Sequence, residues 1–580
     1  MEHDAPKRKF MKRNRCQETS SLKSRLALTC RRVDFMEQKV VLIGLDGASP
    51  QIVERMVAEG KLPNFAKMMT SGAYGQLRSV ITTSSAPAWT TAATGVNPGK
   101  HGIFDFGWYD GYSWKLVDSS KRRARPIWQI LSSSNRRVCI VNVPITFPPD
   151  KVNGEMISGV CATMDSNFTY PPSLRQELIQ SGYRIEPQYP GASILDAEVA
   201  VDNLVHKVLI TEERRKDTLL RLMASGKPDF AFVVFVATDR LQHFLWNYQR
   251  HIEAVYEKMD EIVGAILSEV SDTTNVIIMS DHGFGPVRRC FRPNTFFIEA
   301  GLFRLRLSVQ QILRKLGITE IGAFRVARRI LGTERVGRMV GGRQGFLRRI
   351  FRDLGVQIPS THLATYREAN WTKTKAFSPA PHMIKINLVG REPKGIVPPE
   401  EYEQLRDHIT HELLRYIDPE TGMKPVKSVH KREEVFHGPF VEEAPDLVFE
   451  MEEGYNDNQY VGESISVNAG DEFERGLGLS GRHLIDGIFM AIGPCVRSGA
   501  SIRSGQIADI APTVLYLMGL PVPTYMDGKV LVECIRPSAL EQSPIRTTEA
   551  QQGEEKLGQG YSAKEEEELL EKLRRLGYVS

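Results

Sequence analysis

The chain has 580 residues, 41% of them hydrophobic, which is enough to bury one large core or two ordinary ones. Its formal net charge of +5 is too small for this length to indicate nucleic-acid binding by itself. The seven cysteines are scattered without a C-x-x-C pair, which argues against a disulfide framework or a thiolate zinc site.

The sequence also argues against membrane insertion and secretion. No apolar run approaches the roughly 18 residues that a spanning helix needs, and the basic N-terminus lacks the apolar region of a signal peptide. We therefore expect a soluble, cytoplasmic protein without a transmembrane segment. Residues 1–36 are polar, basic and aperiodic, which predicts a disordered leader, with a nucleic-acid-binding arm as the alternative.

The first patterned element is the β-branched run at residues 40–45, which is typical of a strand buried on both faces of a parallel sheet. It ends in Asp46-Gly47. Open α/β sheets place their ligands at the carboxyl ends of such strands, so Asp46 is a candidate ligand. A turn aspartate before glycine is the alternative interpretation.

A hydroxyl-rich stretch at residues 82–95 predicts a strand end that turns into a helix. Pro87 suits a helix start, and a serine just before it would cap the helix beside outward-pointing N–H groups that form an anion site. Taken alone, the pattern also fits a plain helix cap. In the glycine-rich loop that follows, His101 is either a phosphate contact or a histidine that packs the loop.

Further polar residues lie at or near the ends of strands predicted later in the chain. The apolar run at 230–236 precedes Asp239 and His243, which share one helix face and suit a divalent metal, although a surface Asp–His pair is equally ordinary. The strand predicted at 275–279 runs into Asp281 and His282, and His483 precedes a strand predicted at 486–492. Because most of these residues lie at strand ends, we expect them to form one site.

This set of motifs resembles the alkaline phosphatase superfamily, and more closely its type I phosphodiesterase/nucleotide pyrophosphatase branch. The resemblance covers roughly residues 38–300 and 365–535. The matching motifs are Leu45-Asp46-Gly47, Ser85-Ala86-Pro87-Ala88-Trp89, Thr94-Gly95, His101-Gly102, Asp239-x-x-x-His243, Ser280-Asp281-His282-Gly283, Gly481-x-His483, Asp509-Ile510-Ala511-Pro512-Thr513 and Met526-Asp527-Gly528. It implies an α/β fold with a doubly wound, mostly parallel sheet and helices on both faces.

The resemblance also implies a set of roles for these residues. Asp239, His243 and His483 would hold one divalent ion, most plausibly zinc with manganese as the alternative. A second ion would be held by Asp46, Asp281, His282 and the nucleophile Ser85. The reaction implied is hydrolysis of a small phosphorylated substrate through a phosphoseryl intermediate. Trp89 and His101 are the predicted substrate contacts, and Ser84 is the rival nucleophile.

The charge of the predicted metal site and the residue at position 89 both bear on the substrate class. Two divalent ions against three carboxylates leave about one positive charge at the site, which attracts a phosphoryl anion. Trp89 stands where sulfatases carry an arginine, which argues against sulfatase activity, and the residues that select a nucleotide are not recognisable.

The remaining segments are assigned by composition. The catalytic core is predicted over 37–302 and 368–535, interrupted by a basic insert of amphipathic helices at 303–367 that could contact anions or lipid headgroups. Residues 536–580 are predicted to be a linker followed by a short amphipathic helix that docks on the core or contacts a partner. Two alternatives to a hydrolase remain: a phosphotransferase or mutase on the same site, and a non-catalytic protein that binds anions or membranes. No specific nucleic acid is expected.

Overall fold

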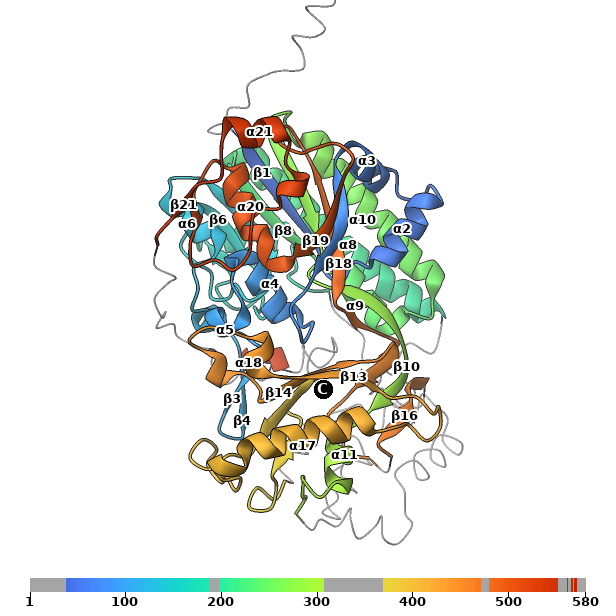
Figure 1. The fold of residues 1–580 in the computed structure, drawn as a ribbon. Coiled ribbons are helices and arrows are strands. Elements are labelled where there is room, and N and C mark those ends of the chain that lie inside the picture. Colours follow the sequence, from blue (N-terminus) through green and yellow to red (C-terminus); the bar gives the residue numbers. More distant parts are fainter. Residues whose placement is uncertain are drawn as a thin grey trace, which may run out of the picture.

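The computed structural model describes residues 38–187, 198–306, 369–462, 464–470, 479–550, 561, 565–566 and 568–570. These residues form a large lobe and a smaller one that faces one edge of its sheet (Figure 1). The predicted leader at 1–36 and nearly all of the predicted insert at 303–367 lie outside the described residues. No helix in the described part of the chain is both long and apolar enough to cross a membrane.

The large lobe is built on a nine-stranded sheet in the order β19-β2-β18-β9-β1-β8-β5-β6-β7. The strands are β1 (Lys39–Leu45), β2 (Ala73–Arg78), β5 (Val138–Val143), β6 (Gly154–Ser158), β7 (Thr169–Tyr170), β8 (Phe230–Phe235), β9 (Thr274–Met279), β18 (Asp486–Ile492) and β19 (Ala500–Gln506). The four central strands β5, β8, β1 and β9 run parallel, and nearly all of their residues are buried, as expected for a sheet covered on both faces. The predicted doubly wound, mostly parallel fold is confirmed.

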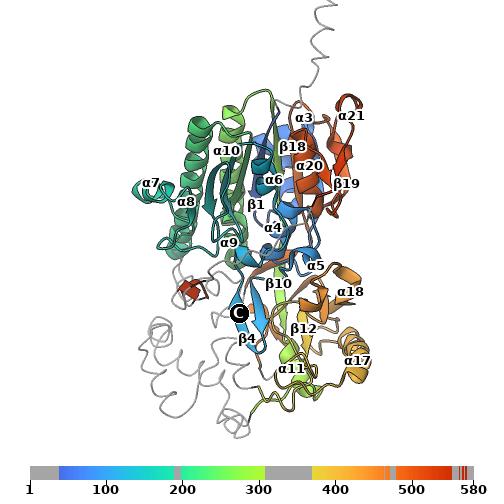
Figure 2. The same cartoon turned by 90° about the vertical axis from the view of Figure 1, so that its left-hand side faces the viewer.

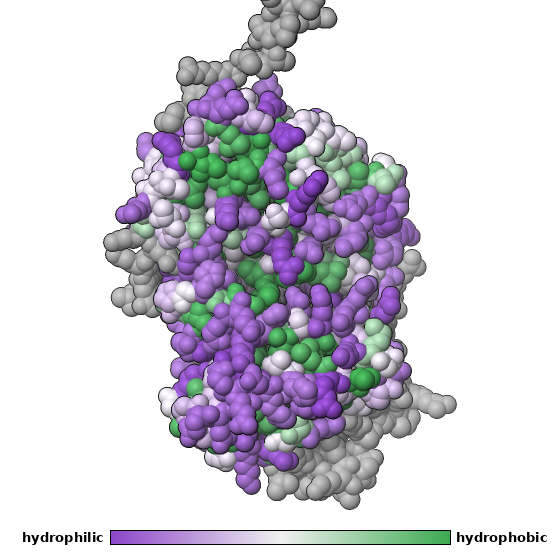
Figure 3. Space-filling model, in the orientation of Figure 1, coloured by the Kyte–Doolittle hydropathy of each residue, from purple (hydrophilic) through white to green (hydrophobic). Residues whose placement is uncertain are grey.

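Helices cover both faces of this sheet, and each face has its own apolar cluster. Figure 2 shows the sheet between α8 and α10 on one side and α4 and α20 on the other. The covering helices are α2 (Pro50–Ala58), α3 (Pro63–Ser71), α8 (Glu198–Gly226), α9 (Ala237–Leu245) and α10 (Gln249–Glu269) on one face, and α4 (Ser85–Thr94), α6 (Ile127–Ser133) and α20 (Ile510–Leu517) on the other. On the face seen in Figure 3, hydrophilic residues predominate, and a prominent hydrophobic area lies near α20.

The smaller lobe has its own sheet, in the order β11-β12-β14-β13, and its own apolar cluster. Its elements are α11 (Pro293–Glu299), β11 (Ala376–Phe377), β12 (Met383–Ile386), α17 (Tyr402–Arg415), β13 (Val426–Lys431), α18 (Arg432–Val435) and β14 (Leu447–Met451). The predicted return to the catalytic core at residue 368 is therefore too early, because the chain rejoins the large sheet only at β18. The short apolar runs of β12 and β14 look in sequence like strands of the large sheet.

The two lobes are joined by β10 (Gly283–Phe291), which pairs with β15 (Gly454–Asp457), β16 (Ser466–Asn468) and β17 (Gly481–Leu484). A hairpin of β3 (Gly107–Asp110) and β4 (Ser113–Leu116) also reaches the smaller lobe, since Tyr112 stacks on Trp371. Short peripheral elements complete the lobes: α5 (Pro98–His101), α7 (Leu174–Gln180), β20 (Val522–Pro523), α21 (Pro537–Gln542) and β21 (Thr547–Thr548).

The C-terminal helix docks on the large lobe within the few residues described there. Leu569 is buried among Ala86, Phe106 and Trp114, and the Tyr561 hydroxyl donates to the carbonyl of Cys161 at 2.8 Å. Leu569 therefore packs on the core, and contact of this segment with a partner stays a prediction.

Candidate active site

Three neighbouring parallel strands bring the predicted ligands to one edge of the large sheet. In the register of these strands, Leu45 of β1 lies opposite Phe235 of β8, and Gly44 lies opposite Met279 of β9. Asp46 therefore emerges beside α9, which carries Asp239 and His243, and beside Asp281 and His282, which follow β9. Carboxyl ends of adjacent parallel strands are where open α/β sheets place their ligands.

The first group of donors surrounds Ser85, the first residue of α4. The Ser85 Oγ lies 3.4 Å from Asp46 Oδ1 and 3.2 Å from His282 Nε2. His282 Nε2 is in turn 3.3 Å from Asp281 Oδ2. All four side chains are fully buried. Backbone and ring N–H groups fix them: Gly47 N donates to Asp281 Oδ1, and His282 Nδ1 donates to the carbonyl of Gly283, so that Nε2 faces the site.

The second group consists of Asp239, His243 and His483, the last delivered by β17. His483 Nε2 lies 3.0 Å from both Asp239 Oδ1 and His243 Nε2, and His243 Nε2 lies 3.3 Å from Asp239 Oδ1. His483 Nδ1 donates to the carbonyl of Thr83 at 2.7 Å, which directs Nε2 toward the other two donors. The seven predicted residues thus meet in one place, although they span more than four hundred positions of sequence.

These donors fit divalent cations. Donor atoms of Asp46, Asp281 and His282 lie within 4.8 Å of one another, as do those of Asp239, His282 and His483. His282 therefore lies between the two groups rather than in the first alone. Carboxylate oxygen and neutral imidazole nitrogen suit Zn²⁺ and, less selectively, Mn²⁺. Within the described residues, no well-formed hydrogen bond reaches the buried Asp281 Oδ2, which leaves this oxygen available to a cation.

The pKa values of the three aspartates reflect their burial and their closeness to one another. Burial, followed by the charges of Asp281 and Asp239, raises the pKa of Asp46 well above its usual range. Burial also raises the pKa of Asp281 to about 7. Burial alone would raise the pKa of Asp239, but the adjacent imidazoles of His243 and His483 hold it well below its ordinary value. Positive charge between these groups would relieve the repulsion.

The turn before α4 distinguishes Ser85 from Ser84. The prediction that the serine before Pro87 caps the helix is corrected: Ser85 is already helical, and Ser84 precedes the helix without a side-chain cap hydrogen bond. Pro87 is tolerated because first-turn N–H groups have no intrahelical partner. The Ser84 Oγ donates to Asp105 Oδ1 at 2.9 Å, away from the donor groups. Thr82 and Thr83 have positive φ, a strained conformation for β-branched residues that is concentrated at functional sites.

The two predicted substrate contacts occupy structural positions. Trp89 is fully buried, its Nε1 donates to Asp46 Oδ2 at 3.1 Å, and its ring lies against Gly44, where an added Cβ would approach to 2.4 Å. His101 is also fully buried: Nε2 contacts the Thr91 hydroxyl and Nδ1 accepts from Ile103 N. Burial lowers the pKa of His101 to about 3, so the ring stays neutral. These positions argue against substrate contact by either ring.

Sequence reasoning missed a buried charge network behind Asp239. The Arg240 guanidinium donates to Asp239 Oδ2 at 2.7 Å and to both carboxylate oxygens of Glu186 at 3.0 and 3.3 Å. Arg240 is fully buried. A charged residue five positions after an apolar strand was the signal available, but its partner Glu186 is 54 positions away. Arg240 holds Asp239 Oδ2 so that Oδ1 faces His243 and His483.

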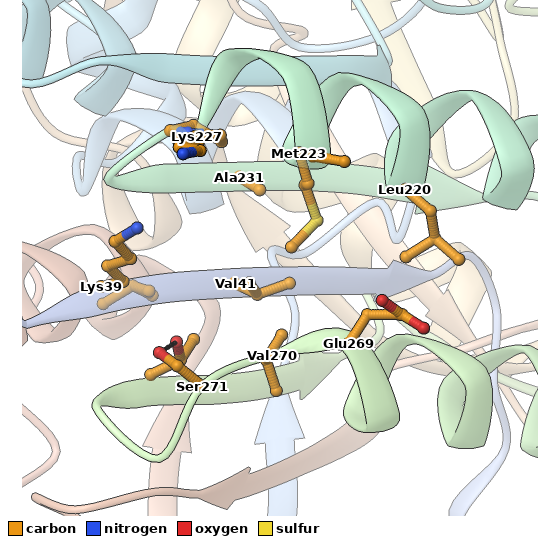
Figure 4. A pocket seen from close by; sticks show the side chains of 13 residues that line it. Lys39, Val41, Leu220, Met223, Lys227, Ala231, Glu269, Val270 and Ser271 are labelled. Carbon is orange, nitrogen blue, oxygen red and sulfur yellow. Dashed lines mark hydrogen bonds between the residues drawn. The ribbon is translucent and has the colours of Figure 1, made fainter.

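A separate cavity of about 180 Å³ lies at the opposite end of the sheet. Figure 4 shows Met223, Leu220 and Val41 pointing into it, with Lys39 and Lys227 near its rim. Lys39 begins β1, whereas Asp46 follows its end, so this cavity is distinct from the candidate active site.

The fold is that of the alkaline phosphatase superfamily, which the sequence motifs resemble. Within it, the chain belongs to the type I phosphodiesterase / nucleotide pyrophosphatase family, a model of which matches residues 40–470. Membership of this family supports phosphoester hydrolysis as the class of activity.

Solved structures and curated proteins give more distant likenesses. Murine ectonucleotide pyrophosphatase/phosphodiesterase 5, an inactive variant in complex with AMP, is 14% identical with a TM-score of 0.48, covering 83% of this chain and 96% of that one. Phosphonoacetate hydrolase from Sinorhizobium meliloti 1021, in complex with phosphonoformate, is 16% identical with a TM-score of 0.48, covering 84% and 97%. A 2,3-bisphosphoglycerate-independent phosphoglycerate mutase from Cereibacter sphaeroides is 56% identical over 36 residues, which is 6% of this chain and only 7% of the mutase.

Proposed function

We propose that the protein hydrolyses phosphoric esters through the Ser85 hydroxyl with the help of two divalent cations, which we assign as zinc. The observation that carries the proposal is the position of the Ser85 Oγ, between Asp46 and His282 at the start of α4 and beside the second donor group. Asp239, His243 and His483 would hold one cation, and Asp46, Asp281, His282 and Ser85 the other. The cations would lower the pKa of the serine hydroxyl and add positive charge around the phosphoryl group.

The chain's own residues supply the nucleophile and its orientation. The Ser85 Oγ forms a bond to phosphorus and gives its proton to water, and the bond from phosphorus to the leaving oxygen breaks, with that oxygen taking a proton from water in turn. Water then adds to phosphorus, the bond to Oγ breaks, and Ser85 regains a proton. The N–H groups of Ser85 and Ala86 at the start of α4 have no intrahelical partner and would stabilise negative charge on phosphoryl oxygens placed beside Ser85. The hydrogen bond from His483 Nδ1 to the Thr83 carbonyl holds the His483 ring beside this turn.

A substrate panel tests the ester class. We expect Ser85-dependent release of nitrophenol from at least one of three substrates, a nitrophenyl monoester, a nitrophenyl diester and a nitrophenyl phosphonate, assayed with Zn²⁺ and then with Mn²⁺. Mass spectrometry of acid-quenched enzyme should find one added phosphoryl or phosphonyl group on Ser85. Turnover that is unchanged in the Ser85→Ala variant would contradict the proposal.

Arg240 provides a second test, because it acts on Asp239 without facing the substrate. We expect Arg240→Lys to raise the metal concentration needed for half-maximal activity by roughly 10–100-fold, as is typical when a residue that orients a metal ligand is lost. Activity at saturating metal should recover to within a few-fold. A metal titration of activity measures both quantities, with Arg55→Lys at an exposed ion pair as the control. An unchanged titration curve would show that Arg240 does not position Asp239.

A phosphotransferase or mutase is the second candidate, favoured by the short match to phosphoglycerate mutases. In that case the phosphoseryl group passes to an alcohol rather than to water. Product analysis in the presence of added glycerol separates the two: a hydrolase gives mainly inorganic phosphate, and a transferase gives mainly glycerol phosphate.

A further inference from the structure

The C-terminal segment packs on the large lobe through an aromatic and an aliphatic side chain. The Tyr561 hydroxyl donates to the carbonyl of Cys161 at 2.8 Å, and the Tyr561 ring stacks on Phe147 with centroids 5.5 Å apart. Leu569 is only 1% exposed. In Figures 1 and 2 the short red fragment of this segment lies level with the junction of the two lobes.

The partners of this segment come from loops at the edge of the sheet where the candidate active site lies. Ile145 follows β5 and Cys161 follows β6. Because β5 runs parallel to both β6 and β8, these loops leave the sheet at the same edge as Asp46. Leu569 shares one apolar cluster with both loop residues, with Trp114 of the β3–β4 hairpin and with Ala86 of α4. The C-terminal segment is therefore bound to the rim of the site.

Two loop residues of this cluster have strained backbones. Ile145 has φ of 54° and Cys161 has φ of 79°, left-handed values that residues with a Cβ rarely adopt. A hydrogen bond holds the carbonyl oxygen of each: Arg122 Nη1 donates to Ile145 O at 3.1 Å, and the Tyr561 hydroxyl donates to Cys161 O. Strain of this kind persists only where the surrounding structure fixes it, and it is concentrated at functional sites. The C-terminal segment supplies one of these fixing contacts.

The cluster reaches the nucleophile through Ala86. Ala86 is fully buried and directly follows Ser85 in the first turn of α4. Close-packed interiors transmit the loss of a side chain to its neighbours, so a void at Leu569 would alter the packing around Ala86. The Ser85 Oγ lies 3.2 Å from His282 Nε2, a distance that a small shift of this turn would change.

The predicted metal ligands are held independently of this cluster. They lie on α9 and β17 or directly follow β1 and β9. In the described part of the chain, no carboxylate or imidazole ligand belongs to the cluster that contains Leu569. A change at Leu569 therefore separates the position of the nucleophile from the affinity for metal.

We propose that Leu569 and Tyr561 of the C-terminal segment position Ser85 for attack. Leu569 completes the apolar packing around Ala86, and Tyr561 fixes the strained loop after β6 that belongs to the same cluster. Both are positioning residues that act through the first turn of α4. This role rests on the proposed phosphoester hydrolysis, and it makes the rate of that reaction depend on a segment more than four hundred residues from the nucleophile.

The test compares Leu569→Ala with Leu569→Met, which keeps the apolar volume. In Leu569→Ala we expect kcat to fall by roughly 10–100-fold, the scale of a slightly misplaced reacting group. KM and the metal concentration for half-maximal activity should stay within about twofold, because the ligands keep their positions. Leu569→Met should restore kcat to within about threefold of the wild type. Tyr561→Phe, which keeps the ring but loses the hydrogen bond to Cys161, should lower kcat in the same direction.

Leu222→Ala is the matched control. It also removes a buried leucine, but from the part of α8 that carries Leu220 and Met223 of the separate cavity at the opposite end of the sheet. This variant should keep kcat within about twofold of the wild type. Hydrogen exchange of the peptide spanning residues 82–95 should be faster in Leu569→Ala than in both the wild type and Leu222→Ala.

The outcomes separate the two proposals. An unchanged kcat in both Leu569→Ala and Tyr561→Phe, or an equal fall in Leu222→Ala, would overturn the positioning role and leave the hydrolase intact. If Leu569→Ala does not fold, kcat of Tyr561→Phe decides alone. If wild-type turnover does not depend on Ser85, the proposed function itself fails, and the positioning role fails with it.

Discussion

Ser85→Ala should reduce turnover of phosphoric esters by at least about 10³-fold, whereas Ser84→Ala should reduce it by less than about tenfold. The two hydroxyls are adjacent in sequence but have different surroundings. The Ser85 Oγ contacts Asp46 and His282, so removing it leaves no nucleophile between the donor groups. The Ser84 Oγ instead donates to Asp105, and its loss weakens only the turn before α4.

Steady-state kinetics of the two variants, with circular dichroism to compare their folding, decide between the serines. Ser85→Ala should bind metal as the wild type does to within a few-fold, because the carboxylates and imidazoles stay in place. Ser84→Ala is the matched control, as it removes an equivalent hydroxyl one residue away. The reverse result, with Ser84→Ala inactive and Ser85→Ala active, would move the nucleophile to Ser84.

The candidate site could be predicted because its residues follow strands whose burial is visible in the sequence. The runs that became β1, β8 and β9 are mostly apolar, and parallel strands of this kind place their carboxyl ends together. A polar residue within a few positions after such a run is therefore informative. Asp46, Asp239 and Asp281 were found by this rule, and the resemblance to a known family added the order of the motifs and the role of each residue.

What escaped prediction depends on pairings between distant segments. β18 is nearly fully buried, as a parallel strand would be, yet it runs antiparallel between β2 and β9. A buried pattern along a strand shows that both faces of the sheet are covered. It does not show whether the adjacent strands run parallel or antiparallel. The contacts of Arg240 with Glu186 and of His382 with Asp457 likewise join residues 54 and 75 positions apart, and neither partner carries a periodic signal.

Removal of divalent cations should abolish activity and lower the melting temperature of the wild-type protein. Asp46 and Asp281 are fully buried in close proximity, and burial raises the pKa of both carboxyls, so the folded site carries an electrostatic cost that a bound cation offsets. A cation that binds only the folded state stabilises it by about 2.7 kcal/mol when its free concentration is 100 times its Kd.

Thermal unfolding after exhaustive chelation, followed by titration with Zn²⁺ and then Mn²⁺, measures this linkage. The melting temperature should rise with metal in the wild type and in Ser85→Ala, but much less in His483→Ala, which removes a ligand without removing a buried carboxylate. His411→Ala, with a histidine lost from the exposed surface of α17, should respond as the wild type does. Stabilisation that persists undiminished in both His483→Ala and Asp239→Asn would mean that the cations bind elsewhere, and the two-cation assignment would then be wrong even if Ser85 proved essential.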